Sequence, residues 1–319
     1  MTARNASLAG IATMLFGILL FSLNDVMGKW LVSTYAPGQL MLVRSAAALL
    51  VLSPFIFRRG LRRTLRPERP RLQCLRVLIG ATESTLFYVC VTYLPLADTM
   101  TLWMAAPVWA VLLAALLLGE KVDPARWAAA GLGFLGVALA MAPSGASFSA
   151  PALLGLTGSV LFAALLIAGR HLRGTPDVTL VAWQTFGSLM LGIALLPFGW
   201  VMPTLRDFGL LALLGVVALL GHLCVTRSLK LAEASVVAPY QYTFIIWALL
   251  FGWLFFNDWP TPTMLCGAAL IVLAGLTLIL LERRSTRALD IARKQAASGT
   301  TLTRLRDPRP RSDGERTAA

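Results

Sequence analysis

The segment Gly119–Pro124, with the sequence Gly-Glu-Lys-Val-Asp-Pro, precedes one long apolar stretch, and Asn257–Pro262, with the sequence Asn-Asp-Trp-Pro-Thr-Pro, precedes another. Upstream, Cys-Val-Thr at 90–92 and Leu-Ala-Asp at 96–98 return as Cys-Val-Thr at 224–226 and Leu-Ala-Glu at 231–233. The sequence therefore predicts two similar halves, residues 1–145 and 146–283, followed by a tail at 284–319. Two-fold internal repetition of this kind is typical of membrane transporters.

The composition indicates a membrane protein. Of the 319 residues, 57% are apolar and 13% are charged, and the mean hydropathy is +0.74. A helix needs about 20 apolar residues to cross a bilayer. Ten segments come near this length: Leu8–Gly28, Pro37–Phe57, Leu75–Leu94, Ala97–Leu118, Arg126–Ala142, Ala152–Gly169, Val178–Trp200, Asp207–Arg227, Val236–Phe256 and Thr263–Leu281. Because no alternating strand pattern is present, we expect an all-α polytopic membrane protein with ten transmembrane helices.

The distribution of arginine and lysine predicts the orientation. Between the end of the second predicted span and the first turn of the third lie eight arginines: Arg58, Arg59, Arg62, Arg63, Arg66, Arg69, Arg71 and Arg76. By the positive-inside rule this loop is cytoplasmic, which places both termini in the cytoplasm. Of the basic residues at the ends of the predicted spans, only Lys29 and Arg206 then fall outside. A half of five spans must enter the membrane in the opposite sense when it is repeated, so the two five-helix repeats are predicted to be inverted.

The formal net charge of +13 does not indicate nucleic-acid binding here, because the basic residues follow the membrane topology. The basic tail at 284–319 is predicted to be disordered in the cytoplasm, beside anionic lipid. The expected partners are a small-molecule substrate and the lipid bilayer of the inner membrane. No cofactor or metal is expected, and the oligomeric state stays open, with a monomer as one option. The four cysteines are scattered without metal-ligand spacing, so we interpret them as reduced packing residues.

Several motifs resemble the drug/metabolite transporter superfamily of the EamA type. In the first half they are Leu94–Asp98, Pro107, Leu117–Glu120 and the glycine-rich Gly131–Gly136; in the second half they are Ala238–Thr243, Trp247, Gly252 and Asn257–Pro260. The second-half motifs are similar to a branch that carries S-adenosylmethionine or riboflavin. Asp258 stands where the family usually has a glutamate, and we expect it only to terminate the helix. The glycines at 131, 133 and 136 are expected to let helix backbones approach closely.

The resemblance implies secondary transport of a small organic metabolite by alternating access. The sequence has no nucleotide-binding motif of the Gly-x-x-x-x-Gly-Lys type, so a gradient or exchange must supply the energy. An exporter of amino acids or drugs in the same superfamily is the alternative within this class. A polytopic membrane enzyme acting on lipid would need clustered acids or paired histidines, and the sequence disperses its acids. A structural or recruiting role has only the tail in its favour. We therefore expect no enzymatic activity.

Charged residues inside predicted spans are costly and usually face a partner or a cavity. Glu83 lies about 12 Å along the third span, at about 1.5 Å per residue, which is near the bilayer centre. It either carries a proton during transport or is locked to Arg44 or to a backbone group. Asp25 and Lys29 are four residues apart and are predicted to pair as a structural or gating pair. Arg44 is predicted to form an internal salt bridge, and His222 is interpreted as a hydrogen-bonded core residue.

Aromatic and amide residues at matching depths predict a substrate cavity. Its expected lining residues are Trp103, Pro107, Gln184, Tyr240, Gln241, Phe244 and Trp247. Such aromatic stripes are also common as plain packing. The mid-span prolines Pro107 and Pro239 favour the cavity, because they free backbone carbonyls that need another partner. A planar heteroaromatic substrate, such as riboflavin or an adenosyl compound, fits this set of side chains.

Overall fold

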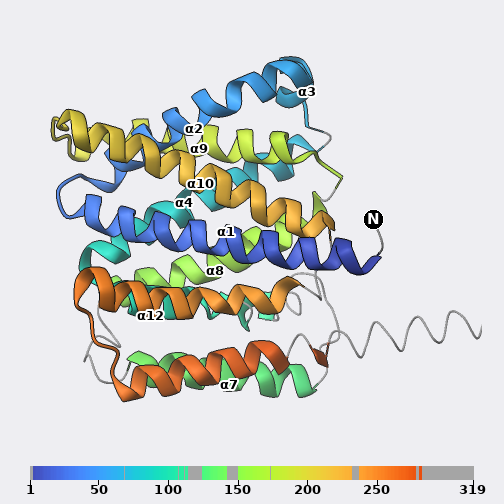
Figure 1. Cartoon of the computed structure of the whole chain (residues 1–319), viewed down its shortest axis with the longest axis vertical. Helices are drawn as coiled ribbons and strands as arrows, with labels where there is room; N and C mark the ends of the chain where they lie inside the picture. The colour runs from blue at the N-terminus through green and yellow to red at the C-terminus, as the bar shows by residue number, and fades with distance from the viewer. Residues whose placement is uncertain are drawn as a thin grey trace, which may run out of the picture. The chain divides into compact units, whose positions relative to one another are not determined.

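A computed structural model describes residues 3–67, 69–106, 108–110, 112–113, 124–141, 150–172, 174–231, 237–277 and 280–281. Over these residues the chain contains helices and no strand. The helices are α1 (Ala3–Val32), α2 (Pro37–Arg59), α3 (Leu61–Leu65), α4 (Pro70–Tyr93), α5 (Leu96–Trp103), α7 (Pro124–Met141), α8 (Ala150–His171), α9 (Asp177–Leu195), η3 (Leu196–Phe198), α10 (Leu205–Leu231), η4 (Ala238–Tyr242), α12 (Thr243–Phe256) and a last helix, Pro262–Thr277 (Figure 1). The all-helical polytopic fold class is confirmed.

Within the described residues, six helices are long and apolar enough to cross a membrane: Leu8–Val32, Pro37–Arg59, Pro70–Tyr93, Ala150–Gly169, Asp177–Phe198 and Leu205–Ser228. Three shorter apolar helices, Trp127–Ala140, Tyr240–Phe256 and Pro262–Thr277, lie where the sequence predicts further spans. The remaining predicted span, Ala97–Leu118, begins as α5, but part of it lies outside the described residues. The predicted tail at 284–319 also lies outside them.

Two helices are interrupted at equivalent places in the two halves. After α5 the chain turns at residues 104–105, where Ala105 donates its backbone N–H to Leu102, before it becomes helical again. In the second half, the 3-10 segment η4, which includes Pro239, lies between the helical residue Val237 and α12. Pro107 lies outside the described residues. Broken helices at matching positions of two repeats are common beside the binding sites of transporters.

The helix contacts repeat between the two halves. Helix α1 packs on α10 and on α12, while α4 packs on α8 and α8 also packs on α5 (Figure 1). The counterparts in the two halves are α1 and α8, α2 and α9, α4 and α10, and α5 and α12. When each helix is exchanged for its counterpart, the α1–α10 contact becomes the α8–α4 contact, and the α1–α12 contact becomes the α8–α5 contact. The α2–α10 contact likewise becomes α9–α4, and the α2–α9 and α5–α12 contacts map onto themselves. This set of contacts is what two equivalent halves around a two-fold axis produce.

Glycines let α2 lie in backbone contact with α9 and α10. A methyl group on Gly192 of α9 would lie 2.6 Å from the backbone nitrogen of Leu42, and one on Gly215 of α10 would overlap the carbonyl oxygen of Arg44. Small residues at membrane helix interfaces give the close packing that replaces the hydrophobic driving force of water. Helix α2 is therefore fixed along its length, and with it the starting point of the Arg44 side chain.

The glycine-rich segment of α7 is used in the same way. A methyl group on Gly136 would lie 2.8 Å from the carbonyl oxygen of Gly267 in the last helix, and one on Gly133 would meet Val108. The expected close approach is confirmed at these two positions. At Gly131 it is wrong, because no atom lies within 4 Å of a methyl group built there.

The arginine-rich loop is shorter than the sequence predicted. Arg58 and Arg59 end α2, and α4 already begins at Pro70, whose fixed φ suits a first helical position. Arg71 and Arg76 therefore belong to α4. Between α2 and α3 the chain turns at Gly60, which has φ of 95°, a conformation that costs a glycine little.

We predict that Gly215→Ala destabilises the protein by about 1–3 kcal/mol, the usual cost of overpacking, because its methyl group would displace the Arg44 backbone. Gly209→Ala is the matched control in the same helix, since a methyl group there meets no atom within 4 Å. Thermal unfolding of the purified variants in detergent measures both effects. Equal melting temperatures for the two variants would show that α2 and α10 are not in backbone contact.

Candidate functional site

Six polar or amphipathic side chains from four helices meet inside the helical bundle. Asn24 and Asp25 come from α1, Arg44 from α2, Glu83 and Tyr88 from α4, and Trp103 from α5. All are buried except Arg44, which is half-buried, and Glu83 is 9% exposed. We call this set the central polar cluster. Buried polar groups are costly unless they are hydrogen-bonded, so the partners of each group decide its role.

Tyr88 is the hub of the central polar cluster. Its hydroxyl oxygen accepts hydrogen bonds from Asn24 Nδ2, at 3.2 Å, and from Arg44 Nη1, and the Arg44 guanidinium lies 5.2 Å from the centre of the tyrosine ring. The ring packs against α1 at Gly28, where a methyl group would overlap it. Tyr88 thus ties α1, α2 and α4 together through one side chain.

Glu83 is held by neutral donors. Trp103 Nε1 donates to Glu83 Oε1 at 2.5 Å, and Ser84 Oγ donates to Glu83 Oε2 at 3.2 Å. Neither expected lock, to Arg44 or to a backbone group, occurs in the described part of the chain, although the Arg44 charge acts on Glu83 through space. The Trp103 ring is buried against Phe87 and Gly158, so it supports the carboxyl from the core.

The expected pairing of Asp25 with Lys29 is wrong. Asp25 accepts a hydrogen bond from Asn24 Nδ2 at 3.1 Å, whereas Lys29 Nζ lies 3.1 Å from Asp258 Oδ2 and 4.6 Å from the Phe256 ring centre. Lys29 sits a further turn along α1, where α12 ends, and can reach the other half of the chain. Asp258 therefore does more than terminate a helix.

Arg44 forms no salt bridge within 4 Å among the described residues, which corrects the expectation for this side chain. Instead of a salt bridge, Arg44 Nη1 donates a hydrogen bond to the Tyr88 hydroxyl. His222 also differs from the expectation. His222 is exposed, and its ring lies edge-on to the Phe21 ring, with 4.8 Å between the ring centres. The ring forms no hydrogen bond in the described part of the chain.

Apart from Trp103, which belongs to the central polar cluster, and Pro107, which lies outside the described residues, the predicted cavity residues fall into two groups. Tyr240, Phe244 and Trp247 form a half-buried stripe that packs on Met14 and Ile18 of α1. Gln241 lies in the same stretch of chain, in η4. Gln184, by contrast, lies in α9 against Gly80 of α4. The structure therefore does not pair the two glutamines, which belong to different helix interfaces.

Sequence reasoning missed two polar residues of α4, Gln73 and Arg76, which together with the predicted Gln184 make up a second polar set. Arg76, Gln73 and the facing Gln184 have buried side-chain atoms that lack a hydrogen-bond partner among the described residues: Arg76 Nε and Nη1, both amide atoms of Gln73, and Gln184 Oε1. We call these three residues the inner polar group. The charge of Arg76 also acts on His222 of α10. A buried guanidinium needs acceptors, so this place is suited to an anionic group.

A sequence signal for this set exists. Gln73, Arg76, Gly80, Glu83 and Phe87 recur at spacings of three and four, which puts them on one face of a helix that starts at Pro70. Counting Arg76 among the loop arginines hid this periodicity. The same face of α4 thus carries Gln73 and Arg76 of the inner polar group and, two turns beyond Arg76, Glu83.

Side chains also link the two halves where α1 and α12 end and α2, α5 and α10 begin, which we call the Lys29 end. Besides the Lys29–Asp258 salt bridge, Tyr35 donates to Asp207 at 2.7 Å. Gln39 donates to the carbonyl of Val201 at 2.7 Å and accepts from its N–H at 3.0 Å. The hydrogen bond to Asp207 raises the pKa of Tyr35, so the phenol stays protonated and able to donate.

Metal and thiol chemistry find no support in the described residues. No group of three or more His, Cys, Asp or Glu side chains that could hold a metal ion occurs there. The four cysteines Cys74, Cys90, Cys224 and Cys266 are free; Cys90 is buried, whereas Cys74 and Cys266 are exposed and so depart from the expected packing role.

Comparison with known proteins adds the family. The profile of the EamA-like transporter family matches residues 8–142 and again 149–281. The chain is 28% identical over 273 residues to the pseudopaline exporter of Pseudomonas aeruginosa strain UCBPP-PA14, covering 85% of this chain and 95% of the relative. It is 24% identical over 279 residues to the S-adenosylmethionine uptake transporter of Rickettsia bellii, covering 86% and 95%. It is 28% identical over 285 residues to the riboflavin transporter of Rhizobium johnstonii, covering 88% and 94%.

One solved crystal structure of a protein has the same fold. It matches with a TM-score of 0.60 and 17% sequence identity, over 88% of this chain and 98% of its own. At this identity the likeness concerns the fold alone.

We predict that Tyr88→Phe lowers stability by about 1–3 kcal/mol, because Arg44 Nη1 loses its acceptor and Asn24 Nδ2 keeps only Asp25 as an acceptor. Tyr93→Phe is the matched control, since Tyr93 ends the same helix and is 69% exposed. Thermal unfolding in detergent compares the two variants. A Tyr88→Phe protein as stable as the Tyr93→Phe protein would contradict the role of the hydroxyl as a hub.

Proposed function

Because the chain belongs to the EamA-like transporter family of the drug/metabolite transporter superfamily, we propose that it is a secondary transporter that moves a small organic metabolite across the inner membrane by alternating access. The observation that carries the proposal is the polar face of α4. Within one membrane-spanning helix it presents Arg76 with unpartnered donors and Glu83 without a cation in direct contact, both among the described residues. Ionisable side chains inside a membrane usually mark a substrate or ion pathway.

Closure at the Lys29 end supports alternating access. The salt bridge and the two hydrogen-bonded links at this end each join the first half of the chain to the second. With the predicted orientation this is the periplasmic side. The state is then closed to the periplasm, and transport requires these links to break while the two halves rock around the central polar cluster.

The side chains favour a planar heteroaromatic metabolite that also carries polar acceptor groups. The half-buried stripe of Tyr240, Phe244 and Trp247 offers aromatic faces, and the inner polar group offers a guanidinium with amide donors and acceptors. The relatives named for S-adenosylmethionine and riboflavin have substrates with planar heteroaromatic rings. An exporter of amino acids or drugs is the alternative.

Flux into proteoliposomes tests the function. Purified protein should move at least one of riboflavin, S-adenosylmethionine or a purine nucleoside faster than empty liposomes do. If none of these competes and aliphatic amino acids do, the heteroaromatic assignment is wrong. If no small molecule moves at all while a lipid substrate is turned over, the transporter proposal itself fails.

We predict that Arg76→Gln weakens the binding of the substrate about ten-fold or more, because a charge-assisted hydrogen bond from the Arg76 guanidinium is lost. Arg71→Gln is the matched control, since Arg71 lies in the first turn of the same helix and is exposed. Equilibrium exchange of the substrate identified by the flux screen gives both affinities. A ten-fold loss of substrate affinity in both variants would show that the general positive charge of this region, rather than Arg76 itself, is responsible.

We further predict that Glu83→Gln abolishes the response of uptake to an imposed pH gradient while substrate exchange continues, because an amide cannot take up the coupled proton. Ser84→Ala is the control, since it removes one hydrogen bond to Glu83 and leaves the carboxyl in place. Gradient-driven accumulation that persists in Glu83→Gln would exclude this role. Failure of the variant to fold, with Ser84→Ala intact, would favour a purely structural role.

A further inference from the structure

A pocket of about 380 Å³ lies at the end of the bundle opposite the Lys29 end, where α2 ends and α9 begins. We propose that it binds the phosphate of an anionic phospholipid headgroup. We call it the arginine pocket; its lining residues are Arg59, Arg62, Arg63, Arg66, Pro67, Thr175, Pro176 and Thr179. The volume falls in the range of small-molecule sites, which is about 300–1,000 Å³. Its assignment does not rest on the proposed substrate.

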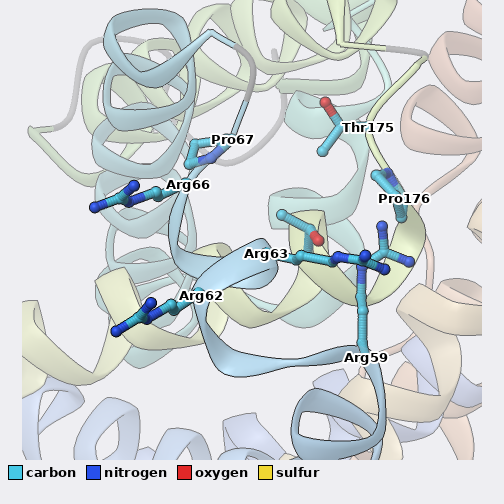
Figure 2. Close-up of a pocket in the computed structure, with 8 residues that line it drawn as sticks. Arg59, Arg62, Arg63, Arg66, Pro67, Thr175 and Pro176 are labelled. Carbon is cyan, nitrogen blue, oxygen red and sulfur yellow. The ribbon is translucent and has the colours of Figure 1, made fainter.

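The four arginines of the pocket carry charge that the described part of the chain does not neutralise. All four are exposed, and none forms a salt bridge there. Guanidinium groups are planar forks of donors that fit phosphate oxygens. Arg59 and Arg63, which reach the same side of the pocket (Figure 2), therefore favour an oxyanion such as phosphate over a neutral polyol.

Thr179 gives independent evidence that a ligand enters the pocket. Its side chain is 1% exposed and lines the pocket, yet its Oγ1 has no hydrogen-bond partner among the described residues. A buried hydroxyl without a partner is costly, and an oxygen of a bound phosphate would accept a hydrogen bond from it. Thr179 also lies in the first turn of α9, where free backbone N–H groups favour an anion.

The pocket is held in shape by the surrounding chain. Trp183 Nε1 of α9 donates to the backbone carbonyl of Thr64 at 2.9 Å, which fastens α3 to α9. The turn at Gly60 sets the direction of α3 relative to α2. Figure 2 shows the result: Arg59 and Arg63 reach toward Thr175 and Pro176, whereas Arg62 and Arg66 extend to the other side.

The residues beside the pocket favour a lipid over a soluble phosphate. Leu61 and Leu65, four residues apart on α3, are 48% and 57% exposed, and Phe57 at the end of α2 is 69% exposed. Apolar side chains next to a cluster of arginines fit acyl chains below a phosphate headgroup. Basic pockets between membrane helices are known to bind anionic lipid headgroups in this way.

The test compares lipid binding by four forms of the full-length protein in detergent. Arg59→Gln with Arg63→Gln removes the two guanidiniums that reach toward α9, and Thr179→Val removes the hydroxyl without changing the charge. Arg58→Gln with Arg71→Gln is the matched control, because it removes two exposed charges of the same region that do not line the pocket. Native mass spectrometry and thermal unfolding measure the binding of phosphatidylglycerol, phosphatidylcholine and inorganic phosphate.

We expect phosphatidylglycerol to be retained and to raise the melting temperature of the wild type and of the control. Its apparent affinity should fall about ten-fold or more in the double pocket variant, since each arginine near an anionic surface contributes about 1 kcal/mol, which corresponds to about five-fold. Thr179→Val should also weaken it measurably.

Three results would overturn the proposal. An equal loss in the Arg58 and Arg71 control would show general attraction rather than a site. Equal binding of phosphatidylcholine would remove the need for the arginines. An equal stabilisation by inorganic phosphate alone would identify a soluble anion as the ligand.

Discussion

Backbone contact through glycine is the constraint on which the rest of this structure depends. In a bilayer, helices gain little by burying apolar side chains against each other, so they associate where they fit closely. Here Gly192 and Gly215 bring α9 and α10 against the backbone of α2. Because α2 cannot shift without a collision, Arg44 starts from a fixed point and its guanidinium meets Tyr88. On the opposite side, Gly28 leaves the space that the Tyr88 ring fills.

This packing divides the buried polar side chains into two kinds. Most of those in the central polar cluster find partners within the protein: Asn24 and Arg44 donate to Tyr88, and Trp103 donates to Glu83, whereas Asn24 Oδ1 has no partner in the described residues. Those of the inner polar group keep donors and acceptors without partners in the described residues. Gln73 and Arg76 of the inner polar group thus share a face of α4 with Glu83 but, unlike its carboxylate, keep buried polar atoms without a partner among the described residues.

The sequence predicts the features that depend on neighbours in the chain. Hydropathy locates the spans, and Pro239 marks a segment that is 3-10 rather than α-helical. Glu83 stands out because a carboxylate is costly in an apolar span. The partner of Lys29 could not be predicted in this way, because Asp258 is 229 residues away and only the fold brings it near. Arg76 was missed for a different reason, since charge counting assigned it to a loop before its helical spacing was considered.

The Lys29–Asp258 salt bridge has a further consequence for how the molecule holds together. Exposed ion pairs contribute about 0–1 kcal/mol each, since water competes for both charges. The two charges here are 16% and 30% exposed, so they are within reach of solvent. The glycine contacts of α2 have no comparable substitute in lipid. At the Lys29 end, the two halves are thus held by a bond that water can replace at small cost. The contacts of α2 with α9 and α10, in contrast, depend on backbone packing for which neither water nor lipid can substitute.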